Sequence, residues 1–315
     1  MRFLIGRIIR AAVTLLLSSF LIFAALYLSP GSPLGFLTGG RTLPAPELAA
    51  LKAQYHLSEP FLQRYATWLG DALHGNFGQS IVFRGESVTS LLAPRATSTI
   101  LLIAYASLLI IVFGVGLGVL SATRRGKLDS VIAVSTTVGL ATPTFVMAIL
   151  LISVFALDTG WFPAFGSGSG LADRLWHLTL PAIALAISGL AYVTQVTRAA
   201  VIAELDHEHV LTARSRGLPE RLVLRRHVLR NAAIPIVTVG GVTVASLLAG
   251  VAVVEQAFGL QGIGAYLIQS VADKDFAVVQ AICLILVSAF IVINAIVDVL
   301  YYLLDPRLRQ ATVHR

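Results

Sequence analysis

The chain has 315 residues, of which 57% are hydrophobic and only 12% are charged, and its formal net charge is +7 at pH 7. A soluble globular protein of this length carries far more charge, so the composition excludes that class and predicts an all-α polytopic membrane protein. The positive charge does not indicate nucleic-acid binding, because most of the 23 Lys and Arg residues fall in segments that alternating topology places on one side of the membrane.

Six apolar stretches are each long enough to cross the bilayer as a helix. We place these spans at 8–28, 96–121, 130–156, 178–203, 233–254 and 277–303. Basic residues at the start of the first one, Arg2, Arg7 and Arg10, put the N-terminus in the cytoplasm, and six spans then return the C-terminus to the same side. We interpret 8–28 as an uncleaved span, not a signal peptide, because it is long and is followed by a poor cleavage site.

The longest loop, 29–95, is predicted to face outward. Residues 46–55 form a short predicted helix. After Pro60, apolar side chains recur at helical spacing and predict an amphipathic helix on the outer membrane face: Phe61, Leu62, Tyr65, Leu69 and Leu73. We therefore divide the chain into 1–95, the first span with this loop, and 96–315, a core of five spans.

Two further outer loops contain glycine clusters. The loop 157–177 includes Gly166, Gly168 and Gly170, and this composition predicts flexibility. The loop 255–276 contains Gly262-Ile263-Gly264, which is too short for a nucleotide-binding fingerprint, so we interpret it as flexible as well.

Residues 204–235 form the most polar segment between two predicted spans. Six arginines fall within it: Arg214, Arg216, Arg221, Arg225, Arg226 and Arg230. We expect one amphipathic helix from Glu204 to Arg216, ended by Gly217, and a second helix from about Glu220 that runs into the membrane near Pro235. The residues alone leave two interpretations open, a rigid projection on the cytoplasmic side or a basic loop that only fixes topology.

No motif indicates catalysis or a bound cofactor. The one Gly-Lys pair, Gly126-Lys127, is followed by Leu128 and does not form a phosphate-binding loop. His207 and His209 lack further ligands at suitable spacing, so we interpret them as a solvated or interface pair and predict no metal site. The chain is therefore not expected to be an enzyme.

Ionisable residues within spans would mark a proton pathway. Only Asp298 lies clearly inside a predicted span, and Arg198 lies near the inner end of the fourth. We interpret both as snorkelling or locally paired residues. The lack of acidic or histidine residues near the predicted midplane argues against a proton-driven carrier.

The segment 212–235 resembles the cytoplasmic "EAA" loop of ABC-importer permease subunits, in the version carried by peptide-type importers. The matching residues are Thr212-Ala213-Arg214, Gly217, Arg226-His227, Leu229-Arg230-Asn231-Ala232 and Pro235. Only Ala213, Gly217 and Leu229 fit the general EAA pattern of the wider family. Because the other residues fit the peptide-importer version, we interpret the departure from the general pattern as typical of that subfamily. The resemblance runs almost end to end, and three further segments carry it: 55–80, Phe258-Gly259 with Gly262 and Gly264, and 304–309.

The resemblance implies the type I ABC importer permease fold and a multi-pass location in the bacterial inner membrane. It implies that the chain forms a passage for di- or oligopeptides with a second permease subunit as a heterodimer. An extracytoplasmic substrate-binding protein would deliver the cargo, and two ATPase subunits would hold ATP and Mg²⁺, with no cofactor bound by this chain. A nickel chelate or another small solute is the alternative cargo within the class.

The resemblance also implies site residues at both ends of the molecule. Those expected to couple to an ATPase are Glu204, Leu205, Asp206, Val210, Leu211, Thr212, Ala213, Arg214 and Gly217. Those expected to meet the binding protein at the outer face are Phe258, Gly259, Leu260, Gln261, Gly262 and Gly264. Of the outer set, Phe258, Leu260 and Gln261 are hypothesised to reach towards the binding-protein cleft.

Two other classes stay open on the sequence. A self-contained secondary carrier would work without an ATPase. A non-transporting membrane scaffold would not couple to an ATPase, and an intramembrane enzyme would need a constellation of catalytic residues. Co-purification with an ATPase separates the importer from both.

Overall fold

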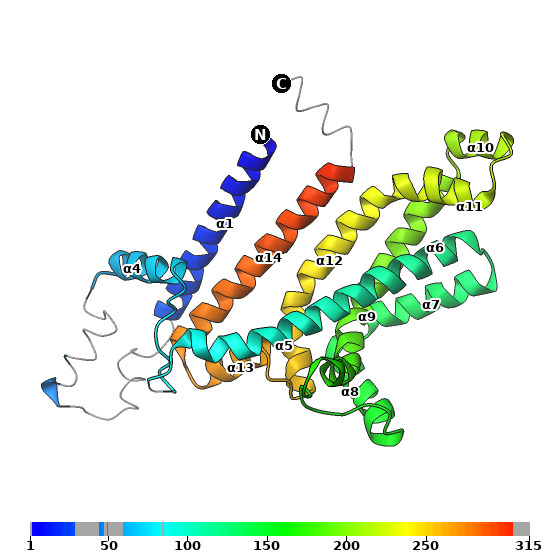
Figure 1. Cartoon of the computed structure of the whole chain (residues 1–315). Coiled ribbons are helices and arrows are strands. Elements are labelled where there is room, and N and C mark those ends of the chain that lie inside the picture. Colours follow the sequence, from blue (N-terminus) through cyan, green and yellow to red (C-terminus); the bar gives the residue numbers. More distant parts are fainter. Residues whose placement is uncertain (1, 29–43, 47–48, 50–58, 84, 305–315) are drawn as a thin grey trace.

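The computed structural model describes residues 2–304 apart from 29–43, 47–48, 50–58 and 84 (Figure 1). The predicted helix at 46–55 lies largely outside the described residues, and so does the C-terminal segment that follows Leu304. Every regular element in the described part is a helix.

Five helices are long and apolar enough to cross a membrane. They are α1 (Arg2–Tyr27), α5 (Val88–Leu109) with its continuation through η1 (Ile110–Gly114) into α6 (Val115–Thr123), α9 (Leu171–Leu205), the run of α11 (Glu220–Val223), η3 (Leu224–Val228) and α12 (Leu229–Ala257), and α14 (Phe276–Leu304). They confirm five of the six predicted spans. α5 and α9 begin earlier than predicted, at Val88 and Leu171. For α5 the reason is local, because the Ser87 side chain accepts from the Ser90 backbone N–H and caps the helix.

The third predicted span is broken, and the expectation of an uninterrupted helix over 130–156 is wrong. The segment forms α7 (Lys127–Ala141), then α8 (Thr144–Leu151) with η2 (Ile152–Asp158), and the two halves are bent by 108°. Pro143 lies at the break. It has no backbone N–H to donate and it drives Thr142 into an extended conformation, with ψ 119°.

Helix α4 (Phe61–Leu73) confirms the predicted helix of the first outer loop. Its aromatic face packs on α1, where the Tyr65 ring lies 5.3 Å from that of Phe20 and 5.7 Å from that of Phe23. The Tyr65 hydroxyl is also 2.8 Å from the Ser19 hydroxyl. The apolar face thus packs in part against protein, and α1 in turn packs against α14.

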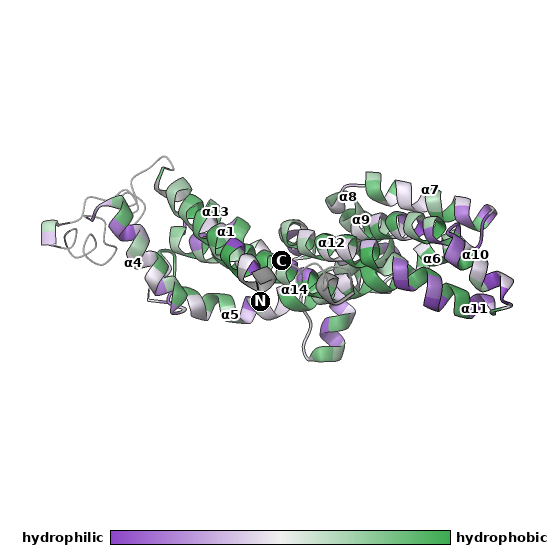
Figure 2. Ribbon diagram, turned by 90° about the horizontal axis from the view of Figure 1, so that it is seen from above, coloured by the Kyte–Doolittle hydropathy of each residue, from purple (hydrophilic) through white to green (hydrophobic). Residues whose placement is uncertain are grey.

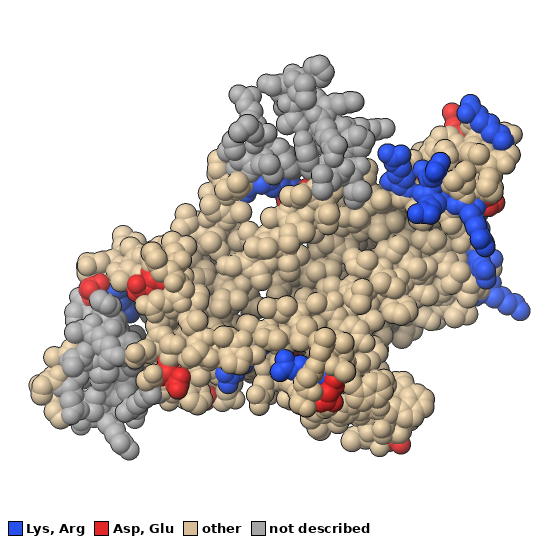
Figure 3. All heavy atoms as spheres, in the orientation of Figure 1, with Lys and Arg blue, Asp and Glu red and all other residues tan. Residues whose placement is uncertain are grey.

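Polarity separates one end of the bundle from its body. The start of α1, the end of α14, and the elements α10 (Glu208–Ser215) and α11 lie at the same end (Figure 1). Hydrophobic residues dominate the long helices, and hydrophilic ones gather around α10 and α11 (Figure 2). Lys and Arg side chains concentrate at that end as well (Figure 3). This distribution agrees with the predicted cytoplasmic side.

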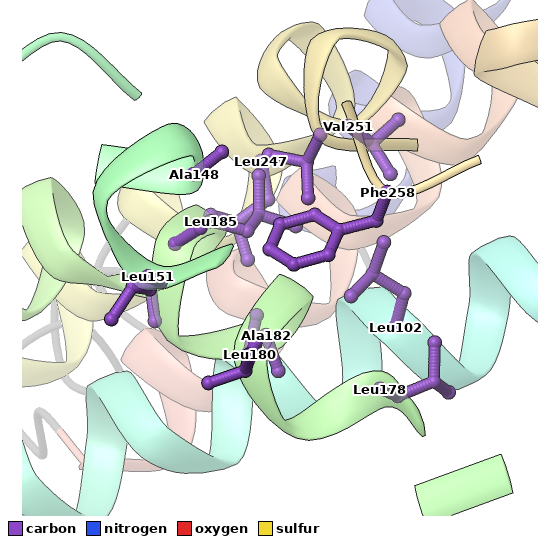
Figure 4. Packing of buried hydrophobic residues seen from close by; sticks show 14 of the residues in the cluster. Leu102, Ala148, Leu151, Leu178, Leu180, Ala182, Leu185, Leu247, Val251 and Phe258 are labelled. Carbon is purple, nitrogen blue, oxygen red and sulfur yellow. The ribbon is translucent and has the colours of Figure 1, made fainter. Parts of the chain in front are cut away.

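The largest apolar cluster is built around α9, which packs against α5, α6, α7, α8 and α12. Figure 4 shows Phe258 pointing into this cluster between Leu102 of α5 and Leu185 of α9. A second cluster lies at the inner end, where α6, α9, α10 and η3 meet. A third joins α5, α13 (Ile263–Ala272) and α14. The two ends of the molecule are therefore packed separately.

Candidate functional site

The predicted cytoplasmic projection is present, but it is not one helix. Helix α9 continues as far as Leu205, and Asp206 and His207 then interrupt it before α10 begins at Glu208. His207 is extended, with ψ 147°, so the two helices cannot be continuous. The expectation of a single helix from Glu204 to Arg216 is corrected on this point, because Glu204 and Leu205 belong to the membrane helix.

The end of α10 follows the Schellman pattern at Gly217. This glycine has φ +76° and its N–H donates to the Arg214 carbonyl at 2.9 Å. The next N–H, of Leu218, donates to the Ala213 carbonyl at 3.3 Å, and the Leu218 side chain packs against the inner cluster. These two bonds satisfy carbonyls that the helix end would leave open, and the left-handed φ favours glycine. The predicted helix stop at Gly217 is confirmed.

The structure divides the predicted coupling residues into two faces. Val210 and Ala213 are buried and pack with Val201 of α9 and Val223 and Val228 of the returning helix. Leu205 packs against the same cluster. On the opposite side Leu211 is 53% exposed, and Asp206 and Thr212 are exposed as well. The buried face fixes α10 to its own chain, and only the other face is available to a partner.

One ion pair joins α10 to α11. The Arg214 guanidinium donates from Nε and Nη2 to the two carboxylate oxygens of Glu220, at 2.9 Å and 3.2 Å. Arg214 was expected to help couple the chain to an ATPase, but here its bidentate contact is within the chain. The pair spans Gly217 and holds the two sides of the turn together.

The two histidines singled out in the sequence lie beside a third histidine and a glutamate in the structure. The rings of His207 and His209 lie 5.7 Å apart, and the His227 ring of η3 lies 6.5 Å from that of His209. Glu204 approaches both, with its carboxylate 3.8 Å from His207 and 3.7 Å from His209. No group of His, Cys, Asp or Glu with a metal-binding arrangement occurs in the described part of the chain. His227 is distant in sequence, so only the fold shows that it joins the pair.

The outer end contains a buried carboxylate that the sequence reasoning missed. Glu255 was placed in the loop 255–276, but it lies in the last turn of α12 and is fully buried. Its two oxygens accept from the Thr99 hydroxyl at 2.6 Å and from the Ala265 backbone N–H at 2.9 Å. The Thr99 hydroxyl accepts from the Ile263 N–H at 2.8 Å. This network ties α5, α12 and the start of α13 together.

The glycines beside this network are required by close packing, so the prediction of a flexible Gly-Ile-Gly loop is replaced. A methyl group at Gly262 would overlap the Glu255 carboxylate. One at Gly264 would lie 2.6 Å from the Ala252 Cα of α12. Both contacts are closer than side-chain carbons allow, so the backbone of α13 can approach α12 only through glycine.

Two of the three side chains hypothesised to reach the binding protein point inward. Phe258 and Leu260 belong to the largest apolar cluster and are almost completely buried. The hypothesis is therefore corrected for both, because reaching outward would remove them from the core. Gln261 and Gly259 remain exposed at this surface.

A second buried carboxylate, Asp275, lies just beyond the other end of α13. It accepts from the Ser80 hydroxyl and from the Ile81 N–H at 3.3 Å, both in the first outer loop. Between the two carboxylates, the Arg95 guanidinium lies 4.1 Å from the centre of the Tyr266 ring. Burial raises the pKa of the Tyr266 hydroxyl above its usual value. Helix α13 is thus held at its start, middle and end.

Local ion pairs account for the two charged residues singled out near the inner ends of the spans, Arg198 and Asp298. Arg198 of α9 donates to both oxygens of Asp129 at 2.7 Å, and Asp129 also accepts from Ser121. Arg7 of α1 pairs with Asp298 of α14. The prediction of local pairing for Arg198 and Asp298 is confirmed.

Known proteins resemble this chain over nearly its full length. Residues 114–310 match the family model of the binding-protein-dependent transport system inner membrane component, and 1–83 match the model of its N-terminal region. Curated relatives include the probable peptide ABC transporter permease protein y4tP of Sinorhizobium fredii, 32% identical over 98% of this chain and 99% of the relative. The oligopeptide transport system permease proteins AppB of Bacillus subtilis and OppB of Escherichia coli are 34% and 33% identical, over 97% and 98% of this chain and 98% and 99% of their own lengths.

Solved structures share the fold. The inward-facing MetNI methionine ABC transporter aligns with a TM-score of 0.55 and 17% identity, over 68% of this chain and 96% of that one. An amino acid ABC transporter solved with histidines aligns with the same TM-score and 20% identity, over 68% and 94%. Together with the spans, these alignments confirm the predicted all-α importer-permease fold.

Proposed function

Since the chain belongs to the family of binding-protein-dependent transport system inner membrane components, we propose that it forms, with a sister permease, the membrane passage through which peptides enter the cell. It is a multi-pass protein of the bacterial inner membrane and a transmembrane subunit of an ABC importer. The proposed cargo is a di- or oligopeptide, since the curated relatives at similar length carry peptide or oligopeptide names.

The coupling element of this proposal is α10. Transmission of a domain motion needs a stiff element with one face fixed to the moving spans and another face free for the motor. In α10 the fixed face is Val210 and Ala213, packed against α9 and η3, and the free face carries Leu211 and Thr212. This two-faced attachment is the observation on which the proposed role rests.

We assign the predicted coupling residues accordingly. Leu211 and Thr212 would contact an ATPase subunit, with Glu204 and Asp206 at the edge of the contact. Leu205, Val210 and Ala213 would pass the motion to the spans, and Arg214 and Gly217 would keep the turn rigid. ATP and Mg²⁺ would be held by two ATPase subunits and not by this chain.

The outer face would receive the binding protein. Helix α13 offers a surface whose position is set by Glu255 and Asp275. Gln261 and Gly259 are the predicted outer-site residues left exposed there, so they are the proposed contacts of that set. Substitution of Gln261 with a larger residue should weaken capture of the loaded binding protein without affecting assembly with the ATPase, whereas a substitution at Gly259 would also strain the backbone, which has φ +60° there.

The test is affinity purification of the chain from its native membrane, followed by ATPase assays. We expect recovery of a second permease and ATP-hydrolysing subunits, and stimulation of hydrolysis by the peptide-loaded binding protein. Gly217→Val should abolish the stimulation, because a β-branched residue at φ +76° is strained and shifts the end of α10. Gly217→Asn is the matched control and should retain most of it, since asparagine tolerates this conformation.

Each outcome separates the open classes. Recovery of the chain without ATPase subunits, under conditions that keep other importers intact, would favour a stand-alone carrier. Equal stimulation in the valine and wild-type proteins would refute the role of the turn. The cargo is tested by uptake of labelled dipeptides and oligopeptides in reconstituted vesicles. Uptake of a nickel chelate in place of peptides would keep the importer and change its substrate.

A further inference from the structure

The inner end of the molecule carries a group of exposed cations that the coupling role does not use. Two lie in the turn between α6 and α7, one begins α7, and four lie along α11, η3 and the start of α12. We call them the basic collar: Arg124, Arg125, Lys127, Arg221, Arg225, Arg226 and Arg230. All seven are exposed, and none makes an ion pair within the described part of the chain. Asp129 lies close enough to Arg125 to interact electrostatically, but both its oxygens already accept from Arg198.

The inner apolar cluster brings the two halves of the collar onto one surface. Ala122, just before Arg124, packs in the same cluster as Val223 and Val228 of the returning helix. These segments are about a hundred residues apart in the chain, so their charges meet only because the fold joins them. Figure 3 shows the result as blue side chains gathered on the right, over α11 and the α6–α7 turn.

The collar lies at the level where a membrane presents its headgroups. Arg124, Arg125 and Lys127 lie at the ends of two membrane helices. Arg230 precedes the apolar stretch that starts near Ile234 by four residues, or about 6 Å of helix. The polar layer on each side of the hydrocarbon is about 5–8 Å thick. The ribbon curves between α12 and α11, so that α11 runs in a different direction from the body of α12 (Figure 1).

We propose that the basic collar binds the headgroup phosphates of anionic phospholipids, and that this lipid fixes the depth of the helices from which α10 projects. Guanidinium groups bind phosphate oxygens in a bidentate manner, and juxtamembrane basic clusters attract anionic lipid. A collar with seven cations and no paired carboxylate is complementary to such a surface. The lipid binding stands independently of the proposed transport function, whereas an effect on coupling would rest on it.

An acidic surface of a partner protein is the competing occupant. The collar is on different elements from the free face of α10, and four of its members lie beside apolar membrane segments at Leu128 and Ile234. A protein docked on α10 would approach from beyond the headgroups, whereas lipid is already adjacent. We therefore assign the collar to lipid and use the partner as an outcome of the test.

The experiment measures lipid retained by the full chain after release from vesicles of equal phosphatidylglycerol and phosphatidylcholine, using native mass spectrometry. We expect a preference for phosphatidylglycerol in the wild type. The variant Arg225→Gln/Arg226→Gln should reduce this preference about thirtyfold. The control Arg174→Gln/Arg216→Gln removes the same charge outside the collar and should keep it. Arg225→Lys/Arg226→Lys should keep most of the preference, which guards against a loss due to misfolding.

Four results would overturn the proposal. The first is equal retention of both lipids by the wild type, and the second is an unchanged preference in the glutamine variant. The third is competition by inorganic phosphate as strong as that by the lipid, which would indicate a site for a soluble anion. The fourth is an unchanged lipid preference in the glutamine variant together with loss of the ATPase subunits that co-purify with it from its native membrane, which would assign the collar to a protein partner. Because lipid retention is read without ATPase activity, its failure leaves the Gly217 test of the proposed function unaffected.

Discussion

The two ends of this molecule hold their surface helices by different physical means. At the outer end, α13 packs in an apolar cluster with α5 and α14 and is fixed in addition by the buried carboxylates of Glu255 and Asp275, whose partners are backbone N–H groups and hydroxyls. At the inner end, α10 is fixed by an apolar cluster around Val210 and by one exposed ion pair. Hydrogen bonds to a buried carboxylate demand one geometry, whereas apolar packing tolerates small adjustments. Helix α13 is thus held in one fixed position at the outer surface. Helix α10 is attached to the inner end by one face, and its other face is free.

Three glycines of the predicted sites, Gly217, Gly262 and Gly264, are required for different physical reasons. Gly262 and Gly264 are needed because α12 approaches too closely for a side chain, although neither has a positive φ. Gly217 has open space around it and is needed for its φ of +76°. Substitutions should therefore fail for steric reasons at Gly262 and Gly264 and for conformational reasons at Gly217.

The largest effect is expected from removal of the outer carboxylate. Glu255→Leu leaves the Thr99 hydroxyl and the Ala265 N–H without their acceptor in a buried site, and should lower the free energy of unfolding by about 3 kcal/mol. The measurement is thermal unfolding of the detergent-solubilised chain. Glu255→Gln keeps one acceptor oxygen and should lose less. Gln256→Leu, at the exposed neighbouring position, should change little, and equal transitions in all three variants would contradict the network.

A steric test of the position of α13 comes next. Gly262→Ala places a methyl group against the Glu255 carboxylate and should lower the free energy of unfolding by about 2 kcal/mol. Gly70→Ala in α4 is the control, because it has open space and helical geometry, and should be neutral or slightly stabilising. Unchanged stability in Gly262→Ala would mean that the loop yields, as a flexible loop would.

At the inner end, neighbouring residues should give opposite phenotypes. Val210→Ala opens the inner cluster and should lower the free energy of unfolding by about 2 kcal/mol. Leu211→Ala should leave the thermal transition unchanged and reduce the ATPase subunits that co-purify with the chain, because its side chain faces outward. The distinction between a fixed and a free face would be wrong if one variant lost both its thermal stability and its ATPase subunits. It would also be wrong if neither variant lost either property.

The smallest effect is expected from the exposed ion pair. Arg214→Ala and Glu220→Ala should each change the free energy of unfolding by less than about 1 kcal/mol, since exposed pairs are weak. A double-mutant cycle measures the coupling and should give a similarly small value. A coupling energy several times larger would show that this pair, and not the apolar cluster, holds α10 in place.

Prolines mark where local sequence stops predicting this fold. Pro94, Pro181 and Pro235 all lie inside helices that continue through them. Pro143 ends α7 and turns the chain by 108°. The residue type is the same in all four places, so a reading of apolar length alone gave one continuous third span. Whether the neighbouring helices stabilise a proline-containing helix or a break is decided by packing.

The sequence by itself determined the membrane class, five of the spans, the amphipathic α4 and the end of α10 at Gly217. These features depend on apolar length, helical periodicity and local backbone preference, and each of them is a property of one continuous segment of the chain. Only the tertiary structure decided that Val210 faces inward and Leu211 outward, that His227 joins the two predicted histidines, and that Glu255 is buried. The partner of Glu255, Thr99, is 156 residues away. A side chain's burial depends on which distant element lies against it, and no local pattern contains that information.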